Sequence, residues 1–173
     1  MDIRILGWGY ENIRRFGKLD IDLTQGNNTL PHVTLVMMRN GTGKTTTIHL
    51  IRSVLNGCAT NWTAQQVREF RPKEHAAAIG KFYLKIRFNM DVYYYVLTFD
   101  YENGIASYET SRVSNTSGGL EPGRNLPTSL SGVFDVEEFV NRFIFDGEQA
   151  KKTLNSSSAE AENAIKYLYR VDR

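Results

Sequence analysis

A glycine-rich run near residue 40 combines the residue types that bind phosphate groups. Glycines let the backbone approach a ligand closely and turn several N–H groups toward one point. A lysine placed after them reaches the β- and γ-phosphates of a nucleotide, and the next hydroxyl ligates Mg²⁺. The run therefore predicts a P-loop that binds ATP, with Lys44 on the phosphates and Thr45 on Mg²⁺. The predicted nucleotide-binding set in this region is Arg39, Asn40, Gly41, Thr42, Gly43, Lys44, Thr45 and Thr46.

One position departs from the usual pattern. A full P-loop has a glycine five residues before Gly43, where this chain has Met38. That glycine belongs to the strand exit rather than to the phosphate contact, so we expect an altered loop that still binds.

Two elements must flank such a loop if its N–H groups are to converge on a ligand. Before it, the apolar run 33–37 is typical of a strand buried on both faces of a mostly parallel sheet. After it, apolar residues recur at helical spacing until Asn56 and Gly57, which predicts a helix of about three turns from Lys44. Its dipole favours negative charge at the loop.

The rest of the chain predicts a single α/β domain over residues 1–173, with a mixed sheet, an antiparallel meander and helices packed on the sheet. Alternating or apolar residues predict a hairpin of strands over 3–6 and 18–23, and alternation predicts a strand over 81–88. Dense β-branched and aromatic residues predict a strand over 92–99, with a bend at 90–91, and a third strand of this group is expected over 104–112. A short helix is expected over 62–70, capped near Thr63. A long loop is expected over 114–131, followed by helices over 135–140 and 159–169 and a strand over 142–145. We expect a P-loop unit over 1–57, an antiparallel β subdomain at about 80–112, and a third region over 135–173.

Composition narrows the class of protein further. The 173 residues include one cysteine, Cys58. The formal net charge is +2, so the charge of the whole chain does not indicate nucleic-acid binding. The three histidines lack metal-ligand spacing. Without a long apolar run or a signal-peptide pattern, the sequence predicts a cytoplasmic protein with no membrane contact.

Three segments together carry a resemblance to a known family. They are residues 12–16 (Asn-Ile-Arg-Arg-Phe), the Asn-Gly-x-Gly-Lys-Thr-Thr loop, and residues 143–148 (Phe-Ile-Phe-Asp-Gly-Glu). In this combination the chain resembles the coiled-coil ABC ATPases of DNA metabolism: the SMC, RecF and RecN group, most nearly the DndD-like ATPases of DNA phosphorothioation and anti-phage defence, with the Lamassu SMC-like subunit nearby. The resemblance implies the N-terminal lobe of an ABC-type ATPase head.

The resemblance also implies residue roles. Arg14 would lie near the bound nucleotide, with a solvated hairpin arginine as the alternative. Asp146 occupies the place of the family's Q-loop glutamine, so it would ligate Mg²⁺ and act with Lys44 in catalysis. Gln149 is the second choice for that role, and a plain loop is the alternative for both.

The family's remaining catalytic motifs are absent from these residues, so hydrolysis would need a C-terminal lobe and a second head. We therefore expect a truncated lobe that binds ATP better than it hydrolyses it. DNA and other subunits of the system are expected as partners only because of the resemblance. Lys81, Lys85 and Arg87 share one strand face. That face could contact DNA phosphates, or it could be an ordinary solvated face of the sheet. The alternatives are a stand-alone P-loop kinase or small NTPase, and an interaction module that uses the tyrosines at 93–95.

Overall fold

The structure is a computed structural model that describes residues 3–24, 34, 36–39, 41–74, 76–112 and 119–127. The chain divides into two compact units. The first combines Met1–Met37 with Gly57–Asn125, and Met38–Asn56 belongs to the second. The predicted P-loop and the helix after it therefore lie in one unit, and the sheet lies in the other.

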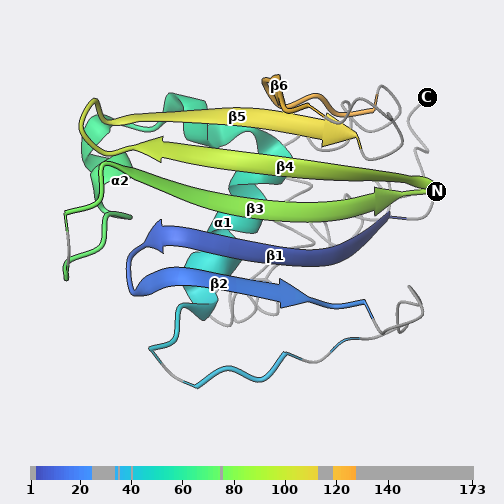
Figure 1. Cartoon of the computed structure of the whole chain (residues 1–173), viewed down its shortest axis with the longest axis horizontal. Coiled ribbons are helices and arrows are strands. Elements are labelled where there is room, and N and C mark those ends of the chain that lie inside the picture. The colour runs from blue at the N-terminus through green and yellow to red at the C-terminus, as the bar shows by residue number, and fades with distance from the viewer. Residues whose placement is uncertain are drawn as a thin grey trace, which may run out of the picture. The chain divides into compact units, whose positions relative to one another are not determined.

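The first unit is built on a six-stranded sheet with the order β2-β1-β3-β4-β5-β6 (Figure 1). Every neighbouring pair of these strands is antiparallel. The strands are β1 Ile3–Ile13, β2 Phe16–Asp22, β3 Ile79–Phe88, β4 Asp91–Asp100, β5 Ile105–Arg112 and β6 Glu121–Pro122.

One face of this sheet carries the core of the unit. Alternate residues of β3 are buried, and the partners they meet in β4 are buried as well. Aromatic and β-branched residues favour such a pleated surface. Tyr93 and Tyr95 belong to the buried face, whereas Tyr94 points to the other face and is half-buried. The largest fully buried side chains in the unit include Tyr10, Phe82, Leu84, Ile86, Tyr95, Leu97, Phe99 and Tyr101.

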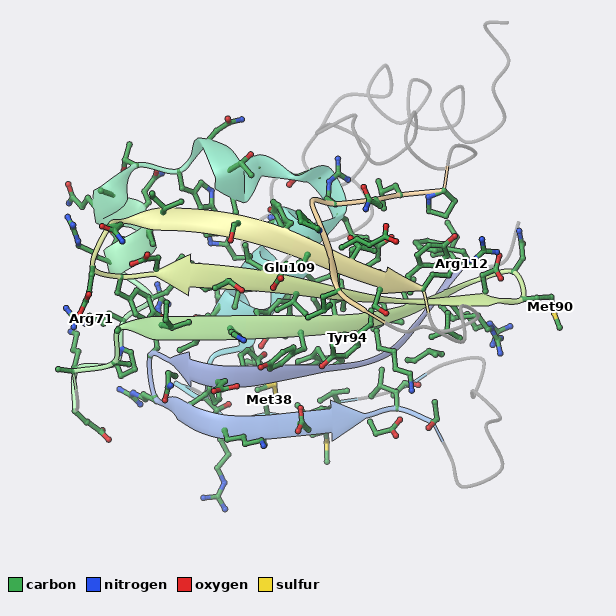
Figure 2. The ribbon with its side chains drawn as sticks, turned by 45° about the horizontal axis from the view of Figure 1, so that its top comes forward. Met38, Arg71, Met90, Tyr94, Glu109 and Arg112 are labelled. Atoms are coloured by element: carbon green, nitrogen blue, oxygen red, sulfur yellow. The ribbon has the colours of Figure 1, made fainter. Side chains whose placement is uncertain are left out.

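The opposite face is polar and carries charges of both signs. Lys81, Tyr83, Lys85 and Arg87 alternate along it on β3, all half-buried. Figure 2 looks onto this face, where Tyr94 and Glu109 are labelled. Two glycines of β1 leave room for neighbouring groups here: a Cβ on Gly7 or Gly9 would collide with residues 21 or 20 of β2.

Two short helical segments complete the described first unit. The 3₁₀ turn η1 covers Cys58–Asn61, and α2 covers Ala64–Arg68. Thr63 begins α2 through a capping box, in which its hydroxyl accepts the N–H of Gln66 and the Gln66 side chain accepts the N–H of Thr63. A Cβ on Gly104, whose φ is 68°, would collide with Ala64, so α2 lies against the β4–β5 turn.

The described helix of the second unit is α1, which spans Lys44–Asn56. Its buried residues include Leu50, Ile51, Val54 and Leu55, as the helical spacing predicted. Gly57, which follows the helix, adopts φ 76°. Left-handed backbone of this kind suits glycine and ends the helix, which confirms the predicted stop.

The prediction of a strand before the P-loop is wrong for the residues of that segment that the structure describes. Thr34 and residues 36–39 form no strand, and Val36 and Met37 are 38% and 86% exposed. Val33 and Leu35 lie outside the described residues. The prediction of a mixed sheet fails with it, because the sheet of the described chain is antiparallel throughout.

Other predicted elements are confirmed with small shifts. The N-terminal hairpin forms, but β1 continues through the aromatic stretch to Ile13 and pairs with β3 on its far side. The β3–β4 bend falls at residues 89–90, one residue earlier than expected. The predicted loop contains the two-residue strand β6, and the elements predicted beyond residue 127 lie outside the described chain.

None of the helices in the described part of the chain combines the length and the apolar character that crossing a membrane requires.

Candidate functional site

The two described glycines of the predicted P-loop adopt conformations that other residues avoid. Gly41 has φ 77° and Gly43 has φ 90°. The turn closes where Thr42 donates its backbone N–H (3.3 Å) and its hydroxyl (2.6 Å) to the carbonyl oxygen of Arg39. A side chain at either glycine would strain this backbone. Asn40 lies outside the described residues.

Lys44 bends back over the chain that precedes the loop. Its ammonium donates to the carbonyl oxygens of Met38 at 3.0 Å and Arg39 at 3.3 Å. The side chain is nevertheless exposed, so a ligand can reach it. The backbone of Met38 thus takes part in the site, although its side chain replaces the expected glycine.

The first turn of α1 presents one accessible hydroxyl and its backbone N–H groups. Thr45 is exposed, whereas Thr46 and Thr47 are buried. The hydroxyl of Thr47 donates to the carbonyl oxygen of Gly43 at 2.9 Å. No acidic residue occupies this turn, so no carboxylate competes for the positive end of the helix.

These features suit a phosphate group on the helix N-terminus. Loops whose glycines take left-handed conformations, with a lysine beside them and an acid-free helix start, are the kind of backbone that binds phosphate groups. Thr45 supplies an accessible oxygen of the kind that Mg²⁺ binds. The further metal ligand predicted at Asp146, with its alternative Gln149, lies outside the described residues. Within the described chain, no group of three or more histidine, cysteine, aspartate or glutamate side chains is arranged to hold a metal.

Arg14 occupies the β1–β2 turn of the first unit in a well-defined setting. Its φ is 51°, a conformation that costs a non-glycine residue on the order of 1 kcal/mol. Its backbone N–H donates to the carbonyl oxygen of Phe70 at 2.7 Å, and its Nε donates to that of Glu69 at 3.4 Å. The guanidinium carbon lies 4.9 Å from the centre of the Phe70 ring.

Tyr101 contacts the backbone at the same turn through its hydroxyl group. Its hydroxyl lies 2.8 Å from the carbonyl oxygen of Asn12 and 3.1 Å from that of Phe70. Burial raises the pKa of Tyr101, so the hydroxyl keeps the proton that it donates. Neither Phe70 nor Tyr101 was singled out in the sequence. The one sequence signal was that Phe70 is an aromatic residue at the end of the helix predicted over 62–70.

The basic residues considered for DNA lie on the polar face of β3, interleaved with acids. The hydroxyl of Tyr83 donates to Glu11 at 2.7 Å, and burial together with this carboxylate raises the pKa of Tyr83. Hydrogen bonds from Thr24 lower the pKa of Asp22, with a smaller contribution from Lys85. The face is therefore close to neutral rather than a basic patch, which favours the solvated-sheet interpretation of Lys81, Lys85 and Arg87.

Comparison with known proteins adds no family to this picture. No protein-family model matches the chain, and no curated protein matches it either.

Proposed function

We propose that this chain binds Mg-ATP through the P-loop at residues 40–46. The observation that carries the proposal is the loop itself: Gly41 and Gly43 take left-handed conformations, and Lys44 begins α1 directly after them. In P-loops, glycines of this conformation followed directly by a helix bring backbone N–H groups and the positive end of the helix dipole to the phosphates.

Each residue of the site has a role in this proposal. Lys44 would leave the carbonyl oxygens of Met38 and Arg39 and bind the β- and γ-phosphates. Gly41 and Gly43 would let the backbone approach those phosphates closely, and Thr45 would ligate Mg²⁺. When bound, the metal neutralises charge on the phosphates. Asp146, or Gln149 in its place, would complete the metal ligands.

We further propose that the chain is the N-terminal lobe of an ABC-type ATPase head related to the SMC-like and DndD-like group. The antiparallel strands β3, β4 and β5, which follow α1 in sequence, support a lobe of this kind over a compact kinase. Hydrolysis would then need the C-terminal lobe and a second head. Action on DNA, in modification, defence or repair, rests on the resemblance of residues 12–16, the P-loop and residues 143–148.

Calorimetric titration of Mg-ATP into three proteins tests nucleotide binding: the wild-type chain, Lys44→Ala, and the matched control Lys85→Ala. Lys44→Ala should weaken binding by about a hundredfold or more, because charge-assisted bonds of about 1.5–3 kcal/mol each are lost. Lys85→Ala removes the same charge from the sheet and should leave the affinity unchanged. Equal affinity in all three proteins would refute the P-loop as the binding site.

A further inference from the structure

Strand β2 forms an open edge of the sheet in the first unit. Within the described chain it pairs with β1 alone, at the outer side of the strand order (Figure 1). The opposite edge is partly covered, because β6 pairs with Glu109 and Thr110 of β5 and η1 contacts the same strand. An open edge presents backbone N–H and C=O groups that can bind another strand. β2 is therefore the edge at which the sheet can be extended.

The hydrogen bonds between β1 and β2 show which backbone groups of β2 point outward. The backbone N–H of Leu23 donates to the carbonyl oxygen of Leu6 at 2.8 Å, in register with the pairs that Leu19 and Ile21 make in β1. Alternate residues of an antiparallel strand bond the same neighbour, so the backbone groups of Leu19 and Ile21 also face β1. The outward backbone groups are those of Lys18, Asp20 and Asp22.

The side chains of β2 divide between the two faces of the sheet. Lys18 and Asp20 are exposed on the polar face. Leu19 lies on the apolar face beside the buried Tyr10, its partner in β1, and is 37% exposed. Alternation places Gly17 on the same face, and a Cβ added to it would meet no atom within 4 Å. The edge thus offers one charge of each sign, an exposed apolar side chain and open space beside it.

The charges of this edge complement a second copy of the same strand in one register. If two β2 strands pair antiparallel about a two-fold axis at Leu19, each Lys18 lies opposite Asp20 of the second copy. An axis at Lys18 or at Asp20 would instead place two like charges directly opposite each other, which destabilises a sheet. The axis at Leu19 is also central to the seven residues Phe16–Asp22, so the two strands overlap along their whole length.

The apolar face selects the same register. An axis at Leu19 brings the two exposed leucines together and places Ile21 of one copy opposite Gly17 of the other. The open space beside Gly17 accommodates the isoleucine side chain. Cross-strand pairs on one face of a sheet are the contacts that stabilise it.

We propose that β2 is a homodimer interface, in which two copies of this chain pair their β2 strands antiparallel about an axis at Leu19. The interface uses neither a nucleotide nor Lys44, so it is distinct from the nucleotide-dependent engagement of two heads and goes beyond the function proposed above. The two six-stranded sheets become one continuous sheet across the dimer.

Charge exchange tests the interface on the full chain without nucleotide, by sedimentation velocity over a range of protein concentrations. Lys18→Glu and Asp20→Lys should each weaken the dimer by about tenfold or more, because attractive cross-strand pairs become repulsive. The double variant Lys18→Glu/Asp20→Lys should restore it, because the opposite charges face each other again. Lys73→Glu makes the same charge change at an exposed position away from β2 and is the control. Circular dichroism verifies that each variant folds.

Cysteine cross-linking tests the register. In a Cys58→Ser background, Leu19→Cys should form an intermolecular disulfide on mild oxidation. Residues that face each other at a non-hydrogen-bonded position of an antiparallel pair have Cα atoms about 4.5 Å apart, a separation that a disulfide spans. Ile21→Cys is the control and should not cross-link, because the two copies of this residue lie about 14 Å apart along the strands in the proposed register.

Three results would overturn the proposal: a wild-type chain that stays monomeric at every concentration, a dimer that both single charge variants leave intact, or cross-linking through Ile21→Cys but not Leu19→Cys. Lys44→Ala separates this inference from the proposed function, because it should dimerise as the wild type does. Dimers that form only with Mg-ATP and not in Lys44→Ala would overturn the β2 interface and leave the proposed function standing. Dimers of a chain that binds no Mg-ATP would do the reverse.

Discussion

At the scale of single residues, the lysine of the predicted P-loop donates hydrogen bonds to backbone oxygens of the segment before the loop. Lys44 donates to the carbonyl groups of Met38 and Arg39. A phosphate must therefore compete with these two oxygens for the ammonium. The charge that phosphates carry decides this competition, because hydrogen bonds between ionised groups are roughly twice as strong as neutral ones.

Met38→Gly should leave Mg-ATP binding within about tenfold of wild type, the change that 1.4 kcal/mol produces. The reason is that the contact of Met38 with Lys44 uses its carbonyl oxygen, which glycine also has. Calorimetric titration of the two proteins measures the effect. A much larger gain in affinity would mean that the methionine side chain obstructs the loop.

Tyr108→Phe should lower the free energy of unfolding by about 1–3 kcal/mol. The hydroxyl of Tyr108 accepts the backbone N–H of Ala59 at 3.1 Å, and both residues are buried. Removing it leaves that N–H without this acceptor. Urea denaturation measures the change. Tyr94→Phe, on the polar face of the sheet, is the control and should stay within about 0.5 kcal/mol; equal effects in both variants would contradict the assignment.

At the scale of elements, the β4–β5 turn is organised by one carboxylate. Asp100 accepts the backbone N–H groups of Glu102 and Asn103 at 3.1 and 2.9 Å. It also accepts the side-chain amide of Asn103 at 2.7 Å. These bonds, chiefly those from Asn103, lower the pKa of Asp100 below its ordinary value of 3.8.

Asp100→Asn should therefore destabilise the chain at neutral pH and matter less in acid. Because the pKa is lower in the folded state than in the unfolded state, the ionised group stabilises the fold above pH 3.8. That contribution is lost as the pH falls through the depressed folded value. Urea denaturation from about pH 6 downward measures the difference between the two proteins. Glu102→Gln is the control, because it removes another carboxylate of the turn without affecting these bonds. If the stability difference between wild type and Glu102→Gln also disappeared as the pH fell, the role of Asp100 would be contradicted.

Local periodicity predicted most elements of the described chain, and its one clear failure has a physical cause. Alternation located β3, the density of β-branched and aromatic residues located β4, and the cap expected near Thr63 located the start of α2. The apolar run 33–37 was interpreted as a buried strand, yet an apolar run fixes neither burial nor pairing. The contact of β1 with β3 joins residues far apart in the sequence, so no local pattern could predict it.

The candidate site was likewise predicted in its local features but not in its tertiary contacts. Glycine, lysine and threonine at fixed spacing predicted the loop because those residue types have distinct chemistry. The carbonyl partners of Lys44 could not be predicted, since every residue has a carbonyl group. Phe70 and Tyr101 reach Arg14 only through the tertiary fold. Asp146 and Gln149 stay predictions, because they lie outside the described residues.

At the scale of the whole molecule, hydrogen exchange should distinguish the sheet from the loop that we propose binds nucleotide. Amides of β1, β3 and β4 should exchange most slowly in the sheet, because each of these strands is paired along both sides, and those of the edge strand β2 should exchange faster in the monomer. Mg-ATP should slow exchange within residues 41–47 of wild type and leave Lys44→Ala unchanged. If Mg-ATP slowed amide exchange elsewhere but not within residues 41–47, the proposed site would be contradicted.

The proposed function is tested most directly by measuring nucleotide binding and hydrolysis on the same protein. Steady-state hydrolysis is measured on wild-type chain at a Mg-ATP concentration that calorimetry shows to be saturating, with Lys44→Ala in parallel. We expect binding that depends on Lys44 together with negligible hydrolysis, because the proposed N-terminal lobe would need a C-terminal lobe and a second head for turnover. Robust turnover by the wild-type chain alone would contradict the assignment as an N-terminal ABC-type lobe and favour a stand-alone P-loop enzyme. Absence of binding would contradict the P-loop function itself.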